Sequence, residues 1–194
     1  DVTEFEQTGA NITMLTLITN DAEYNRGAIE QMVEYLVGAR VKGLFVLGGA
    51  GECPWLPGKQ QWAVVETAVH AAAGRVPVIA GTLEPSTQRV LERVRLVETA
   101  GADAIAVTAP YYFGTGADAQ IYHFETVARA TSLPIMLYHI PSTTHIRLAA
   151  DTMRRILELE RIVLVKDSSD EWQLFQDLLA AREARPEVAV LQGI

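Results

Sequence analysis

The chain has 194 residues with 16 basic and 24 acidic side chains, which gives a net charge of −8 at neutral pH. Such a balance excludes nucleic acid and anionic membrane surfaces as predicted partners, because both require clustered lysine and arginine. Hydrophobic residues make up 49% of the chain and charged residues 21%, which predicts an ordinary globular domain with a buried core.

Cysteine and histidine positions give no sign of a metal centre. Cys53 is the only cysteine, so an intrachain disulfide and a cysteine-based metal site are both excluded. His70, His123 and His145 share no metal-ligand spacing with acidic residues, and we predict surface or packing roles for them and no metal. A single cysteine fits a reducing compartment, and we expect a cytoplasmic protein.

Short apolar runs alternate with helical patterns along the chain. Seven runs are predicted strands, at residues 12–18, 43–47, 76–80, 104–108, 133–138, 162–165 and 188–191. Six segments carry apolar residues at helical spacing, around residues 29–37, 62–69, 86–100, 121–130, 148–157 and 171–184. Strands that are apolar throughout are typical of parallel sheets covered on both faces.

This alternation predicts an α/β fold, either a (β/α)₈ TIM barrel or an open doubly wound sheet. The barrel is favoured, because polar or glycine-rich residues follow nearly every predicted strand rather than one switch point. A closed barrel typically needs about 250 residues, whereas this chain ends directly after the seventh predicted strand. We therefore predict a single barrel domain over residues 1–194, truncated after about the seventh strand, with the eighth strand onward absent.

Lys166 stands at the end of the apolar run 162–165, just before a predicted helix. In β/α proteins this edge of the sheet carries the functional sites. A lysine at a strand end is most often a solvated charge or one half of a salt bridge. Alternatively, apolar surroundings favour the neutral amine, which attacks a carbonyl group to form a Schiff base. The position alone leaves both interpretations open.

Short motifs follow successive predicted strands. In chain order they are Gly48-Gly-Ala-Gly51-Glu52, Ala80-Gly81-Thr82 followed by Ser86-Thr87, Pro110-Tyr111-Tyr112, Tyr138-His-Ile-Pro141, Val165-Lys166-Asp167-Ser168-Ser169 and Gly193. Over roughly residues 10–194 this series resembles the dihydrodipicolinate synthase / N-acetylneuraminate lyase family of class I, Schiff-base-forming aldolases. Each motif is weak by itself, and the resemblance rests on their shared order at strand ends.

The resemblance implies a lyase that makes or breaks a carbon–carbon bond between pyruvate, or a related 2-oxo acid, and an aldehyde such as a sugar-acid fragment. It implies that Lys166 forms the Schiff base, that Tyr138 moves protons, and that Tyr112 assists, in the family often from a neighbouring subunit. The imine itself is the electron sink, so no cofactor is expected. Relatives are usually homotetramers or homodimers, so self-association is expected.

The resemblance also implies a substrate-binding set made of Gly48, Gly49, Ala50, Thr143 and Gly193. The glycine-rich loop is suited to present backbone N–H groups to a carboxylate, although a tight turn is the structural alternative. Gly49 and Ala50 stand where the family usually has hydroxyl residues. Losing such a donor costs on the order of 10²-fold in rate. This departure motivates a rival hypothesis, a weakened 2-oxo-acid-binding sensor or partner subunit.

Thr143 stands where dihydrodipicolinate synthases carry an arginine that grips the second substrate's carboxylate. A threonine does not replace a bidentate arginine, so a hydroxylated or neutral aldehyde is favoured. Dihydrodipicolinate synthase proper, with carboxylate recognition rebuilt elsewhere, stays open as a third hypothesis.

Four polar residues near the motifs are expected to have structural roles. Cys53 is predicted to be a small buried thiol, and Glu52 to tie loops together by hydrogen bonds. Asp167 is expected to cap a helix or to bind nearby backbone groups. His139, which replaces the family's usual asparagine, is expected at the rim with a backbone partner.

Overall fold

The computed structural model describes residues 11–16, 19 and 23–193. Within them one sheet of parallel strands runs in chain order: β1 (Asn11–Thr13), β2 (Gly43–Val46), β3 (Val78–Gly81), β4 (Ala104–Val107), β5 (Ile135–His139), β6 (Ile162–Asp167) and β7 (Ala189–Gln192). Each strand pairs with the next one in the sequence. An open doubly wound sheet reverses its strand order at a switch point, so the observed order confirms the barrel-type α/β fold.

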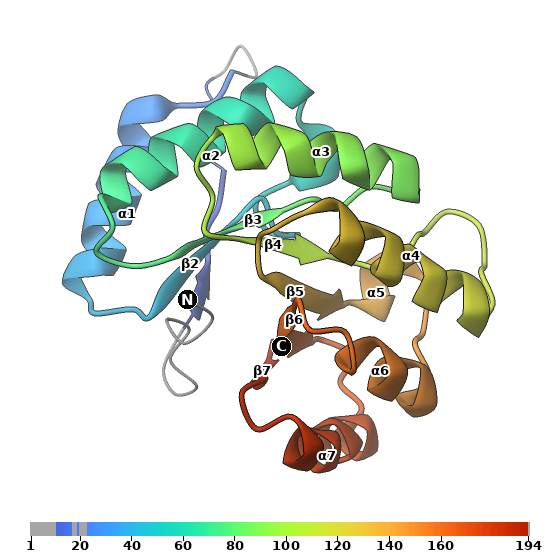
Figure 1. Cartoon of the computed structure of the whole chain (residues 1–194). Helices are drawn as coiled ribbons and strands as arrows, with labels where there is room; N and C mark the ends of the chain where they lie inside the picture. Colours follow the sequence, from blue (N-terminus) through green and yellow to red (C-terminus); the bar gives the residue numbers. More distant parts are fainter. Residues whose placement is uncertain (1–10, 17–18, 20–22, 194) are drawn as a thin grey trace.

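Helices surround the outside of the curved sheet (Figure 1). They are α1 (Arg26–Gly38), η2 (Cys53–Trp55), α2 (Gly58–Ala72), α3 (Thr87–Thr99), α4 (Ala117–Ala130), α5 (Pro141–Thr144), α6 (Ala150–Leu157), α7 (Trp172–Ala181) and η3 (Arg182–Ala184). Every residue of β2, β3, β4 and β5 is buried, as expected for strands covered on both faces. None of the described helices is long and apolar enough to cross a membrane.

The predicted first strand differs from the observed one. Strand β1 ends at Thr13, whereas the prediction ran over residues 12–18, of which 17 and 18 lie outside the described residues. Thr13 and Phe45 are the last register pair, and beyond it Met14 N–H donates to Phe45 O at 2.8 Å. Thr16 then turns its hydroxyl to Gly51 O at 2.7 Å.

Several helix boundaries also differ from the prediction. The predicted helix 148–157 begins at Ala150 after the extended residue Ala149, and the backbone N–H of Leu148 donates to His139 Nε2. The predicted helix 171–184 divides into α7 and a final 3₁₀ turn. The two short helices η2 and α5, three and four residues long, were not predicted, since segments of that length carry no helical periodicity.

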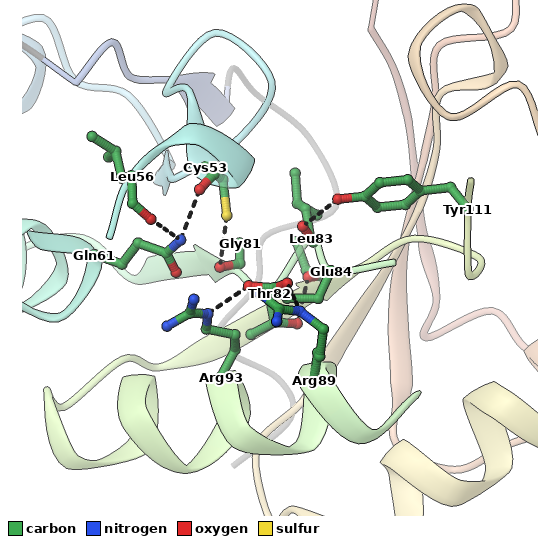
Figure 2. A network of polar contacts seen from close by, with 11 residues as sticks. Cys53, Leu56, Gln61, Gly81, Thr82, Leu83, Glu84, Arg89, Arg93 and Tyr111 are labelled. Carbon is green, nitrogen blue, oxygen red and sulfur yellow. Dashed lines mark hydrogen bonds and ion pairs between the residues drawn. The ribbon is translucent and has the colours of Figure 1, made fainter. Parts of the chain in front are cut away.

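Hydrogen bonds tie the loop after β2 to helix α2 and to the end of β3 (Figure 2). Gln61 Nε2 donates to Cys53 O at 2.7 Å and to Leu56 O at 2.9 Å, which fixes the 3₁₀ turn to helix α2. The Cys53 thiol donates to Gly81 O at 3.6 Å. Cys53 is fully buried, as predicted, and burial raises the pKa of its thiol to about 12.

A buried carboxylate anchors the loop after β3 to helix α3. Glu84 accepts hydrogen bonds from Arg93 Nε at 2.6 Å and from Arg89 Nε at 2.7 Å, and its side chain is 6% exposed (Figure 2). The adjacent Leu83 carbonyl accepts a bond from the Tyr111 hydroxyl at 3.1 Å, which ties the loop after β4 to the same wall. The ion pairs therefore hold the loop after β3 on α3, and the Tyr111 hydrogen bond adds the loop after β4.

Replacement of Glu84 by glutamine is expected to destabilise the fold by about 2 to 3 kcal/mol, because two guanidinium groups lose the buried charge that compensates them. The measurement is the free energy of unfolding in urea. Glu30→Gln breaks the exposed Arg26–Glu30 pair on α1 and is the matched control. Its unfolding midpoint is expected to stay at the wild-type value. Equal effects of the two substitutions would contradict a structural role for Glu84.

Candidate active site

A cavity of about 670 Å³ opens at the carboxyl edge of the sheet. Its walls come from the ends of β1, β5 and β6 and from the loops that follow β2, β3, β4 and β5. The carboxyl ends of parallel strands all meet at this edge, so residues far apart in the sequence converge here.

Lys166 points into this cavity from β6, where it is the half-buried residue of an otherwise buried strand. Its Nζ donates a hydrogen bond to Thr13 Oγ1 at 3.0 Å. The same nitrogen lies 5.1 Å from the ring centroid of Phe45 and 4.7 Å from that of Tyr138. Burial lowers the pKa of Lys166. No carboxylate of the described residues forms a salt bridge with it, so the salt-bridge interpretation of this lysine finds no support.

Tyr138 lies beside Lys166, because the two residues are register partners on β5 and β6. Its ring meets Phe45 edge to face, with 5.4 Å between centroids. Burial raises the pKa of the Tyr138 hydroxyl, and the Ser168 hydroxyl acts in the opposite direction. The phenol therefore holds its proton at neutral pH.

The loop after β2 presents free backbone donors to the cavity. Gly49 and Ala50 both line it, and their N–H groups have no acceptor among the described residues. A Cβ added to Gly49 would lie 3.9 Å from the Tyr138 hydroxyl oxygen. Gly48, which is also in this loop, is buried, and a Cβ on it would lie 2.8 Å from Thr13 Cγ2. The loop thus combines donors for an anion with close approach to Tyr138 and Thr13.

Gly193 and Thr143 take different positions around Lys166. Gly193 follows β7 and donates its N–H to Asp167 O at 2.8 Å. A Cβ on Gly193 would overlap Lys166 Cε and come within 2.7 Å of Ser168 Oγ, so this glycine makes room for the lysine. Thr143 is exposed on α5 and lines the mouth of the cavity.

Tyr112, unlike Lys166 and Tyr138, does not line the cavity. Its side chain is 84% exposed, and its ring packs edge to face on Phe113 at 4.9 Å between centroids. Its backbone has a φ of 83°, in the left-handed region. The neighbouring Tyr111 lines the cavity instead. The structure therefore brings Lys166, Tyr138 and the loop together and turns Tyr112 outward.

Two expectations about polar residues behind the site are wrong. His139 is not at the rim: it is 2% exposed, as is Asp167. Since His139 Nε2 accepts the Leu148 N–H at 3.3 Å, the expected backbone partner, its Nδ1 carries the hydrogen and donates to Asp167 Oδ1 at 2.8 Å. Asp167 caps no helix; its other oxygen accepts from the Ser169 hydroxyl at 2.9 Å. These bonds join the ends of β5 and β6.

Glu52 also departs from its expected role. Its side chain makes no hydrogen bond to any described residue and lines the cavity instead of tying loops together. Thr13, Phe45, Ser168 and Trp55 are site residues that the sequence reasoning did not identify. Thr13 is the second residue of the predicted strand 12–18, so nothing in the sequence placed it at a strand end. In the part of the chain that the structure describes, no group of three acidic, histidine or cysteine residues is arranged to hold a metal ion.

Comparison with known proteins agrees with this geometry. Residues 7–194 match the dihydrodipicolinate synthetase family. The 4-hydroxy-tetrahydrodipicolinate synthase of Staphylococcus saprophyticus is 35% identical over 170 residues, which are 88% of this chain and 57% of the relative. A 4-hydroxy-tetrahydrodipicolinate synthase of Halalkalibacterium halodurans is 38% identical over 156 residues, which are 80% of this chain and 53% of the relative.

Solved structures show the same fold. One is YagE, an E. coli prophage protein of the dihydrodipicolinic acid synthase family in complex with pyruvate. Its TM-score is 0.92 at 30% identity, and the match covers 96% of this chain and 63% of the YagE chain. The chloride-inhibited dihydrodipicolinate synthase of Acinetobacter baumannii, also with pyruvate, gives 0.89 at 27% identity, over 95% of this chain and 63% of that one. This chain spans less than two thirds of these relatives. It belongs to the dihydrodipicolinate synthetase family and has its barrel fold through the seventh strand.

Proposed function

We propose that the protein is a class I lyase in which Lys166 forms a Schiff base with pyruvate or a related 2-oxo acid. The observation that carries this proposal is the environment of the lysine amine. It lies in a cavity of about 670 Å³, in register with Tyr138 and without a salt bridge to any described carboxylate. Burial favours its neutral form, which is the nucleophile.

The residues supply a complete sequence of steps. The neutral amine attacks the ketone carbon, and the carbonyl electron pair moves to oxygen. The Tyr138 hydroxyl gives one proton to that oxygen, and a second proton moves to it from the attacking nitrogen. The oxygen then leaves as water, so that a protonated imine and the Tyr138 phenolate remain. The imine then accepts the electron pair of the bond broken at C3. In the synthetic direction the resulting enamine attacks an aldehyde, and the proton returns through Tyr138. The N–H groups of Gly49 and Ala50 bind the carboxylate of the 2-oxo acid.

We assign the Tyr112 side chain to the cavity of a neighbouring subunit, since its ring is exposed and does not line the cavity of its own subunit. This assignment goes together with the proposal that the complete protein is a cytoplasmic homodimer or homotetramer, as the family resemblance implies. Gly193 acts by leaving space for the Lys166 side chain rather than by touching the substrate.

The aldehyde site favours a neutral, hydroxylated partner. Among the described residues that line the cavity, Lys166 is the sole cation, and Glu52 adds a carboxylate. The mouth carries the hydroxyls of Ser142 and Thr143 and the indole of Trp55, which is 80% exposed. An aldehyde with its own carboxylate finds no guanidinium here. We therefore propose that the partner is the neutral fragment of a 2-keto-3-deoxy sugar acid.

Two rival functions rest on specific observations. The similar proteins named above are 4-hydroxy-tetrahydrodipicolinate synthases, and condensation of pyruvate with aspartate semialdehyde would support that activity here. The loop without hydroxyls at Gly49 and Ala50 supports a 2-oxo-acid sensor instead. Formation of the imine without turnover of any sugar acid in a broad panel would favour the sensor.

Treatment of the complete protein with pyruvate and borohydride is expected to add one reduced pyruvyl group, detected by intact mass. Lys166→Ala is expected to abolish the adduct because it removes the nucleophile. Lys59→Ala, which removes an exposed lysine on α2, is the control and is expected to react like wild type. An adduct that survives in Lys166→Ala, or no adduct on folded wild-type protein, would overturn the proposed mechanism.

The rate of imine formation is expected to rise with pH and to level off above the pKa of Lys166, because only the neutral amine attacks. Burial lowers this pKa from its reference value of 10.5, so the curve is expected to level off at a lower pH than that value. The measurement is the trapping rate as a function of pH, with Nα-acetyl-lysine as the exposed reference amine. Identical inflections for protein and reference would contradict the desolvated environment.

Thr143→Arg is expected to shift the aldehyde preference toward aspartate semialdehyde. Adding a guanidinium at the cavity mouth is expected to raise kcat/KM for aspartate semialdehyde relative to glyceraldehyde by about tenfold, since a charge-assisted carboxylate contact is worth roughly 1.5–3 kcal/mol. Thr99→Arg adds the same charge on the exposed face of α3 and is the control. An unchanged ratio would place the aldehyde away from Thr143.

A further inference from the structure

We propose that Thr13 is the positioning residue of the Schiff-base lysine: its hydroxyl holds the Lys166 amine in place for attack on the 2-oxo acid. This inference rests on the function proposed above and assigns a role to a residue on a different strand. The observation that supports it is the 3.0 Å hydrogen bond from Lys166 Nζ to Thr13 Oγ1.

The bond crosses the interior of the curved sheet. Thr13 is the last residue of β1, whereas Lys166 is on β6, and these two strands are not neighbours in the sheet. Both residues line the same cavity. The threonine therefore approaches the amine from the side opposite to the strand that carries it, across the space where the substrate is proposed to bind.

The Thr13 hydroxyl orients an N–H bond of the Lys166 amine, which the other contacts of this amine do not do. A lysine side chain has four rotatable methylene groups, and its tip loses considerable freedom when it is held in one place. The rings of Phe45 and Tyr138 attract the charged form of the amine without fixing its hydrogens. Among the described residues, Thr13 Oγ1 is the one hydrogen-bond acceptor of Lys166 Nζ. It therefore directs one N–H bond of the amine and restricts the directions left for the lone pair.

The local packing is built around the threonine. Gly48 has no side chain, and a Cβ there would lie 2.8 Å from Thr13 Cγ2, so the loop leaves room for the methyl group. Gly49 and Ala50, the next two residues of that loop, bring no hydroxyl to the cavity. Thr13 supplies a hydroxyl from the neighbouring strand, since Thr13 and Phe45 are register partners on β1 and β2.

The test uses two substitutions that remove different halves of the side chain. Thr13→Val keeps the branched shape and loses the hydroxyl, whereas Thr13→Ser keeps the hydroxyl and loses the methyl group. We expect the rate of pyruvate imine formation, trapped with borohydride in the complete protein, to fall about five- to tenfold in Thr13→Val. The Thr13→Ser rate is expected to stay within about twofold of wild type. Thr99→Val, on the exposed surface of α3, controls for the threonine-to-valine change.

The pH profile separates positioning from packing. A hydroxyl acceptor stabilises the ammonium form, so its loss is expected to move the inflection of the Thr13→Val rate profile to lower pH. A role in packing alone would leave the inflection in place and would slow Thr13→Ser as much as Thr13→Val, and either result would overturn the inference. If Thr13→Val does not fold, Thr13→Ala is measured against Thr13→Ser in the same way.

The outcome also separates this inference from the proposed function. A normal adduct on wild-type protein with an unchanged Thr13→Val rate would overturn the role of Thr13 and leave the lyase intact. No adduct on wild-type protein would overturn both.

Discussion

The site depends on the curvature of the parallel sheet, which lets β1 and β6 contact each other across its interior. Neighbouring strands lie about 4.8 Å apart, so five intervals of a flat sheet would separate these strands by roughly 24 Å. Side chains of threonine and lysine cannot span that distance, yet Thr13 Oγ1 and Lys166 Nζ are 3.0 Å apart. The twist that accumulates along parallel strands thus brings the proposed nucleophile to its hydroxyl partner.

Desolvation of Lys166 is compensated only in part by the groups around it. A buried ammonium is costly unless it is paired, and in the described part of the chain no carboxylate pairs with this one. The aromatic faces of Phe45 and Tyr138 and one hydroxyl compensate it only in part, so burial lowers the pKa of the amine. Where a buried charge serves structure, as at Glu84, two arginines compensate it directly. Glu84 is therefore held as a charged group by two arginines, whereas the Lys166 amine has no such partner among the described residues.

Polar groups around the cavity are distributed over several strands rather than concentrated in one loop. The loop Gly48–Gly51 contributes backbone donors, β1 contributes Thr13, and the end of β6 contributes Ser168. Behind them the His139–Asp167 hydrogen bond joins the ends of β5 and β6, one residue beyond the register pair Tyr138 and Lys166. Spreading the site over strands makes its geometry depend on the pairing of the sheet.

The sequence by itself determined the seven parallel strands, the barrel class and the convergence of Lys166 with Tyr138. Local signals were sufficient there, because apolar periodicity marks each strand and consecutive parallel strands bring their carboxyl ends to one edge. Only the tertiary structure decided that β1 ends at Thr13 and that this residue meets a lysine 153 positions away. It also decided that Tyr112 turns outward and that His139 is buried against Asp167. Those features depend on where strand pairing stops and how far the sheet curls, and both are set by packing among distant residues.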